Sequence, residues 1–351
     1  MTSSAKPFMT SRSPAAARKL AAVPVSEINM REHHLITGGA GFIGSHLCDR
    51  LLAAGLAVSV ADDFSLGTHG NVAHLSGRQD FRVWEGDLSR EGEARRVFAA
   101  ATAAAGPIHQ VWHLAANSDI AAGTTDPGID FRRTLATTFQ TLGAAREQGI
   151  RRLAFASTSA IYGERADLLT ENSGPLLPIS NYGASKLASE ALISAAVECH
   201  LERAWIFRFP NVIGSRATHG AIYDFIGRLA GHPPALRVLG DGTQTKPYLH
   251  VEELVGAMLH IVGHAHERRN VFNIGPADAG VSVAFMAEHA IARVRPGTPI
   301  AYTGGDRGWV GDVPRFRYSV EKLLDLGWVP RLTSAEAVVR AVDEVARDRN
   351  L

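Results

Sequence analysis

The chain has 351 residues, of which 46% are hydrophobic and 20% charged, enough to bury the core of one large domain or of two modest ones. Its formal net charge is +1, with acidic and basic residues spread along the chain, which argues against a nucleic-acid-binding protein. The two cysteines, Cys48 and Cys199, are too few for a disulfide framework, and no segment reaches the roughly 18 apolar residues that span a bilayer, so we expect a cytoplasmic protein without a membrane segment.

Residues 1–30 differ in composition from the rest of the chain. They are rich in Ser, Ala and Arg, with scattered Pro and weak apolar periodicity. Arg12, Arg18 and Lys19 interrupt the continuous apolar core that a signal peptide needs. A transit-like extension is an alternative, but the composition favours a disordered tail.

From His33 onward, short apolar runs alternate with stretches of helical periodicity. A helix is expected over residues 42–54, and the apolar runs predict strands at residues 34–37, 57–61, 81–84, 110–114, 152–156 and 204–208. Strands that alternate with helices are typical of a parallel sheet covered by helices on both faces. The predicted fold class is therefore α/β, with a doubly wound parallel sheet of the Rossmann type.

The pattern of alternating apolar runs and helical stretches changes after about Val212, where Gly and Pro become frequent and the expected helices are short. We expect residues 31–212 to form a dinucleotide-binding domain, to which later segments return, and residues 213–351 to form mainly a smaller α/β lobe that binds the substrate. Such a lobe would close over the carboxyl ends of the strands, where ligands of open parallel sheets bind.

The turn after the first strand reads Thr-Gly-Gly-Ala-Gly-Phe-Ile-Gly, from Thr37 to Gly44. Its glycines permit a tight turn, a close approach of the backbone to a pyrophosphate and close helix–strand packing, and the helix N-terminus offers amides to an anion. The position between a strand and an amphipathic helix favours dinucleotide binding over an ordinary turn. The predicted cofactor contacts are Gly38, Gly41, Phe42, Ile43 and Gly44.

An acidic pair, Asp62 and Asp63, ends the second strand, 18 residues after Gly44. A carboxylate at this place accepts hydrogen bonds from the adenosine ribose and repels a 2′-phosphate, which favours NAD over NADP. Asp63 could share this role with Asp62, or one of the two caps the next turn. The predicted cofactor is NAD.

The next two strand ends also carry residues suited to a cofactor. Asp87 and Leu88 follow the third strand, where Asp87 could accept a hydrogen bond from the adenine amino group or serve as a helix N-cap. Leu114, Ala115 and Ala116 follow the fourth strand, and the two alanines let the chain pass close to the pyrophosphate. All five residues are predicted to line the cofactor site.

Tyr182 and Lys186 lie at the start of a predicted helix, and their spacing of four places both on one helical face. A free tyrosine, with a pKa of about 10, is a poor base at neutral pH, but a nearby ammonium and the positive nicotinamide of NAD could lower that pKa. Thr158, at the strand end of residues 157–159, could donate to the substrate oxygen that Tyr182 deprotonates, or these hydroxyls satisfy backbone groups at a turn. No metal ion is part of the predicted site.

Together these motifs resemble those of extended short-chain dehydrogenases/reductases, and especially of the UDP-glucose 4-epimerase family. The resemblance extends from about His33 to Val342 and rests on the glycine turn, on Asp62 and Asp87, and on the runs His113–Ala116, Ser157–Gly163 and Tyr182–Lys186. It implies that Tyr182 is the catalytic base and also contacts the cofactor, that Lys186 binds the nicotinamide ribose and tunes Tyr182, and that Thr158 is the partner hydroxyl.

The resemblance also implies a nucleotide-sugar substrate, with a UDP-sugar as the expected form. Asn211 and Arg307 resemble residues that contact the diphosphate of the nucleotide. Tyr223 lies in a segment near which the nucleotide could stack. The alternative is that this segment only packs within the small lobe. Ser159 and Lys246 complete the predicted substrate contacts.

Three departures from the family pattern bear on these contacts. Lys246 and Pro247 stand where the family usually has Arg-Asp, so a point charge would replace a phosphate fork. Thr134 stands where an asparagine is customary in the helix behind the cofactor. The altered spacing between Arg307 and Gly311 leaves the role of Arg307 open.

Several reactions fit the same catalytic residues. Relatives that remove water carry an Asp-Glu pair after the threonine, whereas this chain has Ser159 and Ala160, and many decarboxylating relatives have a glutamate at the position of Ala160. Epimerisation at carbon 4, through a 4-keto intermediate with retained NAD, needs only the residues present and is favoured. The alternatives are a UDP-glucuronate decarboxylase, a ketoreductase and a dehydratase. A non-enzymatic NAD sensor is disfavoured because Tyr182 and Lys186 are both present.

The sequence leaves open which sugar is bound, because the sugars differ at groups read by loops. Relatives often dimerise through two helices. The helices expected over residues 130–148 and 182–199 are the candidates here, so we expect a homodimer.

Overall fold

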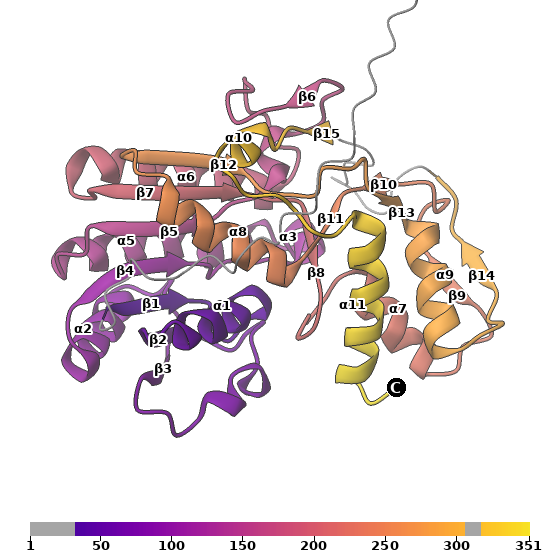
Figure 1. The fold of residues 1–351 in the computed structure, drawn as a ribbon, viewed down its shortest axis with the longest axis horizontal. Coiled ribbons are helices and arrows are strands. Elements are labelled where there is room, and N and C mark those ends of the chain that lie inside the picture. The colour runs from indigo at the N-terminus through magenta and orange to yellow at the C-terminus, as the bar shows by residue number, and fades with distance from the viewer. Residues whose placement is uncertain (1–31, 306–316) are drawn as a thin grey trace, which may run out of the picture.

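The computed structural model describes residues 32–305 and 317–351, so the predicted tail at residues 1–30 and Arg307 lie outside the described residues. Its main feature is a parallel sheet with the strand order β3-β2-β1-β4-β5-β7-β12 (Figure 1). This is the order of a doubly wound Rossmann sheet, with the topological switch point between β1 and β4, and it confirms the predicted fold class. The strands are β1 (His33–Thr37), β2 (Ala57–Asp62), β3 (Phe81–Glu85), β4 (Ile108–His113), β5 (Arg152–Ala156), β7 (Arg203–Arg208) and β12 (Arg269–Asn273).

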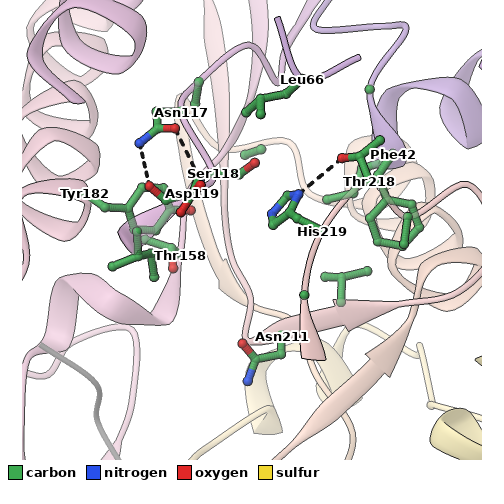
Figure 2. A pocket seen from close by; sticks show the side chains of 18 of the residues that line it. Phe42, Leu66, Asn117, Ser118, Asp119, Thr158, Tyr182, Asn211, Thr218 and His219 are labelled. Atoms are coloured by element: carbon green, nitrogen blue, oxygen red, sulfur yellow. Dashed lines mark hydrogen bonds between the residues drawn. The ribbon is translucent and has the colours of Figure 1, made fainter. Parts of the chain in front are cut away.

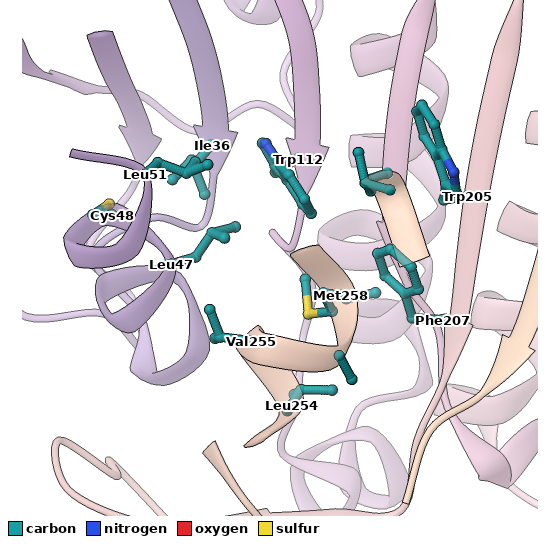
Figure 3. Close-up of a cluster of buried hydrophobic side chains, with 14 of the residues drawn as sticks. Ile36, Leu47, Cys48, Leu51, Trp112, Trp205, Phe207, Leu254, Val255 and Met258 are labelled. Carbon is teal, nitrogen blue, oxygen red and sulfur yellow. The ribbon is translucent and has the colours of Figure 1, made fainter. Parts of the chain in front are cut away.

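Successive residues of a strand point to opposite faces of the sheet. Because both faces carry apolar side chains, helices cover both of them. Ile36 and Trp112 of the sheet share one core cluster with Leu47 and Met258 from the helices on that side (Figure 3). Leu35, next to Ile36, belongs to the cluster on the other face. The first face carries α1 (Phe42–Ala53) and α8 (Val251–His264), and the second carries α2 (Glu93–Ala105), α5 (Thr137–Glu147) and α6 (Asn181–Cys199).

The six strands predicted from the sequence are all present, with ends that differ from the prediction by at most two residues. The seventh strand of the described sheet, β12, was not predicted. It pairs in parallel with β7 through residues that follow α8 in the sequence. The chain therefore returns to the large sheet after it has left it for other elements.

A smaller group of elements lies beside the sheet, on the right of Figure 1. Its core contains Ile226, Met286 and Ala341. The group comprises α7 (Ala221–Ala230), β9 (Leu236–Val238), α9 (Val283–Val294), β14 (Ile300–Tyr302) and α11 (Ser334–Asp348). Short paired strands join it to the sheet or cover the sheet's edge: β8 (Asn211–Ile213) with β11 (Tyr248–His250), β10 (Thr245–Lys246) with β13 (Val281–Ser282), and β6 (Leu168–Leu169) with β15 (Arg317–Tyr318).

Short helices occupy the connections near the carboxyl ends of the strands. Between β4 and α5 the chain forms α3 (Ile120–Thr125), α4 (Pro127–Asp130) and a π-helical turn, Phe131–Ala136. A 3₁₀ helix, Ser159–Tyr162, follows β5, and α10 (Glu321–Asp325) follows β15. In the part of the chain that the structure describes, no helix is long and apolar enough to cross a bilayer.

His113 at the end of β4 is buried and bonded on both ring nitrogens. Its Nδ1 lies 2.7 Å from the hydroxyl of Thr37, and its Nε2 lies 2.9 Å from the hydroxyl of Thr138. The Thr138 hydroxyl donates to the carbonyl oxygen of Thr134, so it accepts from Nε2–H and leaves Nδ1 as an acceptor. Burial, together with the charge of Lys186, lowers the pKa of His113 from 6.5 to about 3.

We expect this histidine to make the protein sensitive to acid. Because the pKa of His113 in the folded state lies below its value in the unfolded chain, the unfolded chain binds the proton first, and stability falls as the pH drops from 6.5 to about 3. His113→Asn should reduce the slope of unfolding free energy against pH in that window by about 1.4 kcal/mol per pH unit. Urea unfolding of both proteins across the window measures it, and parallel curves would rule out this role.

Candidate active site

A cavity of about 790 Å³ opens between the carboxyl ends of the sheet strands and the smaller group of elements. Apart from Arg307, which lies outside the described residues, it is lined by every residue that the sequence predicted for the site. These are Gly38, Gly41, Phe42, Ile43, Gly44, Asp62, Asp63, Asp87, Leu88, Leu114, Ala115, Ala116, Thr158, Ser159, Tyr182, Lys186, Asn211, Tyr223 and Lys246.

The glycine turn is shaped by close backbone contacts. Gly38 has a positive φ of 72°, and a Cβ there would lie 2.7 Å from the backbone nitrogen of Ala115. A Cβ on Gly44 would lie 2.2 Å from the carbonyl oxygen of Gly38. Among the described residues, no side chain caps α1 after Gly41, so the helix N-terminus presents its amides at the cavity. The turn therefore fits the pyrophosphate of a dinucleotide.

The acidic residues of the cavity are also tied to the backbone. Asp62 is buried and accepts from the amides of Ala40 and Phe64, each at 2.9 Å, so it holds the glycine turn against the end of β2. Burial raises the pKa of Asp62. Asp63 accepts from the amide and hydroxyl of Ser65, which is the turn cap that the sequence left open for one of this pair.

Asp87 shows the same kind of local bonding. It accepts from the amide of Ser89 at 3.0 Å and from the Ser89 hydroxyl at 2.6 Å, and Arg90 lies 3.2 Å away. Its carboxylate thus closes a turn after β3 while it lines the cavity.

The structure brings the three predicted catalytic side chains together at the wall of one cavity. Thr158 lies next to Tyr182 and its hydroxyl acts to lower the tyrosine pKa, and the Lys186 ammonium lies 6.0 Å from the centre of the tyrosine ring (Figure 2). Thr158 also accepts from the amide of Ala160 at 3.1 Å, so it satisfies a local backbone group as well. Lys186 is 3% exposed and donates to the carbonyl oxygen of Ala156 at 2.6 Å.

The protein groups around Tyr182 do not lower its pKa as the sequence suggested they could. Burial raises the pKa of Tyr182 to about 12, although the hydrogen bond from Thr158 opposes that rise. Burial also acts on Lys186, whose pKa it lowers to about 7. A lysine whose pKa lies near 7 is only partly charged at neutral pH, so it stabilises a phenolate less than a fully charged lysine would.

The predicted substrate contacts come from several elements. Asn211 starts β8 and is exposed to the cavity, whereas Lys246 in β10 is buried. Tyr223 in α7 has the guanidinium of Arg349 3.8 Å from its ring centre. Ser159 lines the same cavity as Thr158, and its backbone amide donates to the carbonyl oxygen of Phe209.

The cavity wall also contains residues that were not among the predicted contacts. Asn117, Ser118 and Asp119, which lead into α3, line the cavity beside Tyr182 (Figure 2). They directly follow Ala116, so extending the predicted strand-end motif by three residues would have found them. Thr218 and His219 reach the cavity from the loop after β8, and the His219 ring points into it (Figure 2).

Comparison with known proteins agrees with this geometry. The chain matches the NAD dependent epimerase/dehydratase family over residues 34–275. It is 30% identical to a UDP-glucose 4-epimerase of Azospirillum brasilense over 88% of this chain and 90% of that protein. A crystal structure of a UDP-galactose 4-epimerase shares 32% identity and a TM-score of 0.77, covering 90% of this chain and 99% of that one. The Thermus thermophilus UDP-glucose 4-epimerase, solved as a complex with NAD, shares 28% identity and a TM-score of 0.77 over 89% of this chain and 98% of that one. The family match and these relatives show that the chain belongs to the NAD dependent epimerase/dehydratase family and has NAD as its cofactor.

Proposed function

We propose that this protein is an epimerase that inverts carbon 4 of a UDP-sugar through a transient 4-keto intermediate. The observation that carries the proposal is that the side chains of Thr158 and Tyr182 lie next to each other at the wall of the cavity (Figure 2). Two hydroxyls in contact at one wall can hold a single carbinol group between them. The names of the relatives, UDP-glucose and UDP-galactose 4-epimerases, support the same reaction.

In this mechanism Tyr182 acts as a phenolate, which the positive nicotinamide of bound NAD would favour, and it takes the proton of the sugar 4-hydroxyl and later returns it. Thr158 donates to the same oxygen and orients it. Bound NAD supplies reversible hydride transfer at carbon 4. Lys186 uses one N–H on the carbonyl oxygen of Ala156, so its other two N–H groups are available to the nicotinamide ribose. The sugar turns over between the two hydride transfers while its diphosphate stays bound.

We assign the remaining predicted residues to binding. The glycine turn would hold the NAD pyrophosphate, Asp62 and Asp63 the adenosine ribose, and Asp87 the adenine. Asn211, Lys246 and Arg307 would hold the substrate diphosphate, and Tyr223 and Ser159 would contact the nucleotide and the sugar. These roles require the substrate to reach from the smaller lobe, which we propose is formed mainly by residues 213–351, to Tyr182.

Other reactions of this family are less well supported by the same cavity. Elimination of water needs an acid and a base beside the catalytic hydroxyl, and Ser159 and Ala160 supply neither. Ala160 likewise supplies no carboxylate for a decarboxylase. A ketoreductase would use the same Tyr182 and Thr158 but would release its cofactor after each turnover.

The test uses purified protein without added NAD, incubated separately with UDP-glucose, UDP-N-acetylglucosamine and UDP-glucuronate. We expect a new product of unchanged mass from at least one of them, resolved by chromatography and mass spectrometry, because retained NAD is regenerated in each cycle. Loss of water or of carbon dioxide would replace epimerisation by dehydration or decarboxylation. Activity that appears only with added NADH would identify a reductase.

We also propose that the protein is a homodimer. Phe131 and Phe139 are 59% and 62% exposed on the helical segment that the sequence indicated for dimerisation. Large aromatic side chains exposed along one helical segment are more typical of an interface than of a free surface.

A further inference from the structure

A buried ion pair lies behind the proposed catalytic residues. Glu190 of α6 and Arg208 at the end of β7 are 6% exposed each, and two hydrogen bonds of 3.1 and 2.7 Å join the guanidinium to the carboxylate. Such a pair loses much of its attraction to the desolvation of both charges, so it adds little net stability. Its role is therefore better explained by the positions in which it holds the neighbouring residues.

The carboxylate of this pair is bonded to the end of β5. Ser157 donates its hydroxyl to Oε1 of Glu190. One turn earlier on the same helix face, Lys186 donates to the carbonyl oxygen of Ala156. Helix α6 therefore holds two consecutive residues of β5 and its extension, directly before Thr158.

The guanidinium of the pair is bonded to the segment that follows Thr158. Arg208 donates to the hydroxyl of Tyr162 at 3.1 Å and to the carbonyl oxygen of Glu171 at 3.0 Å. Tyr162 ends the 3₁₀ helix that Thr158 caps, and its hydroxyl donates to Asn273 at 2.7 Å. The backbone is thus anchored on both sides of Thr158, on one side through Glu190 and on the other through Arg208.

We propose that the Glu190–Arg208 pair is a positioning device that keeps Thr158 against the phenol of Tyr182. The proposal rests on the proposed function only for its effect on turnover, because Thr158 lies next to Tyr182 without substrate (Figure 2). The hydrogen bond from Thr158 lowers the pKa of Tyr182, whereas burial and Asp130 raise it. Loosening Thr158 while Asp130 and Lys186 stay in place should therefore raise that pKa.

Ser157→Ala tests this with the least disturbance, since it removes the link to β5 and leaves the ion pair intact. In the NAD-bound protein we expect the ionisation constant of Tyr182 to fall about tenfold. An ultraviolet difference titration measures it, with Tyr182→Phe protein as the subtraction. We expect kcat to fall roughly 10- to 100-fold with KM unchanged, because the reacting groups are misplaced rather than the substrate lost. Ser157→Thr, which restores a hydroxyl, should recover most of both.

Glu190→Gln is the second variant, and it should shift the titration in the same direction. Ile193→Ala is the matched control, because Ile193 is fully buried in the core on α6 but has no part in the network. It should lower the melting temperature without changing the Tyr182 titration or kcat. An unchanged titration in Ser157→Ala, or an equal shift in Ile193→Ala, would overturn the proposal. If the wild-type protein epimerises none of the sugars, the proposed function fails, while the titration still decides the role of the pair.

Discussion

Tyr182→Phe should lower the rate of epimerisation roughly 10²- to 10⁴-fold while NAD stays bound. The substitution removes the hydroxyl that contacts Thr158 and keeps the ring that lies beside Lys186. The sugar hydroxyl then loses its proposed proton acceptor, so hydride transfer from carbon 4 becomes slow. The glycine turn and the strand ends, which we propose hold the dinucleotide, are untouched.

The measurement is the initial rate with the active UDP-sugar, together with the NAD released from denatured protein. Tyr302→Phe is a suitable control, because Tyr302 is 44% exposed in β14 and does not line the cavity. It should retain full activity. Undiminished turnover in Tyr182→Phe would remove Tyr182 from the mechanism, and loss of NAD from that variant would make the rate uninformative about proton transfer.

The parts of the site that the sequence predicted are those set by local structure. The glycine turn joins a strand to the next helix within a few residues, so its shape follows from the order of residues alone. Tyr182 and Lys186 share a helix face because of their spacing. The sheet was predictable for the same reason, since its strands β1, β2, β4, β5 and β7 are mostly buried runs between turns, while β3, at the edge, is mostly exposed.

The parts that the sequence did not predict depend on packing between distant segments. Strand β12 begins with Arg269 and Asn270 and ends with Asn273, so its composition is more polar than that of a typical buried strand, and only its pairing with β7 explains it. Glu190 and Arg208 look like ordinary charged residues until α6 docks on the sheet and buries both. The sign of the Tyr182 pKa shift was also beyond reach, because it depends on how deeply Tyr182 and Lys186 are buried.

Asp62 shows how a local motif can carry a second role that only the fold displays. The sequence predicted it as an acceptor for the ribose, from its distance to the glycine turn. In the structure, its two oxygens also accept from the backbone of Ala40 in that turn and of Phe64 after β2. The residue proposed to select the cofactor therefore also shapes the turn that receives the pyrophosphate.

Gly44→Ala should abolish the retention of NAD and destabilise the protein by about 1–3 kcal/mol. In the interior of a helix this substitution ordinarily stabilises by roughly 0.5–1 kcal/mol, so the expected sign is the reverse of the usual one. The reason is steric: a Cβ at Gly44 would lie 2.2 Å from the carbonyl oxygen of Gly38 and 2.7 Å from the Cα of Gly39. Both obstacles are backbone atoms of the glycine turn, which cannot move without displacing the amides that face the cavity.

Gly256→Ala is the matched control, since Gly256 lies inside α8 and a Cβ there would meet no described atom within 4 Å. We expect this control to keep its NAD and to melt at the same or a slightly higher temperature. The two variants are compared by the NAD released per mole of denatured protein and by thermal unfolding. Normal NAD content in Gly44→Ala would show that α1 can move away from the turn without loss of the cofactor. The close contact between Gly38 and Gly44 would then serve helix packing, and the pyrophosphate site would have to be sought at Ala115 and Ala116.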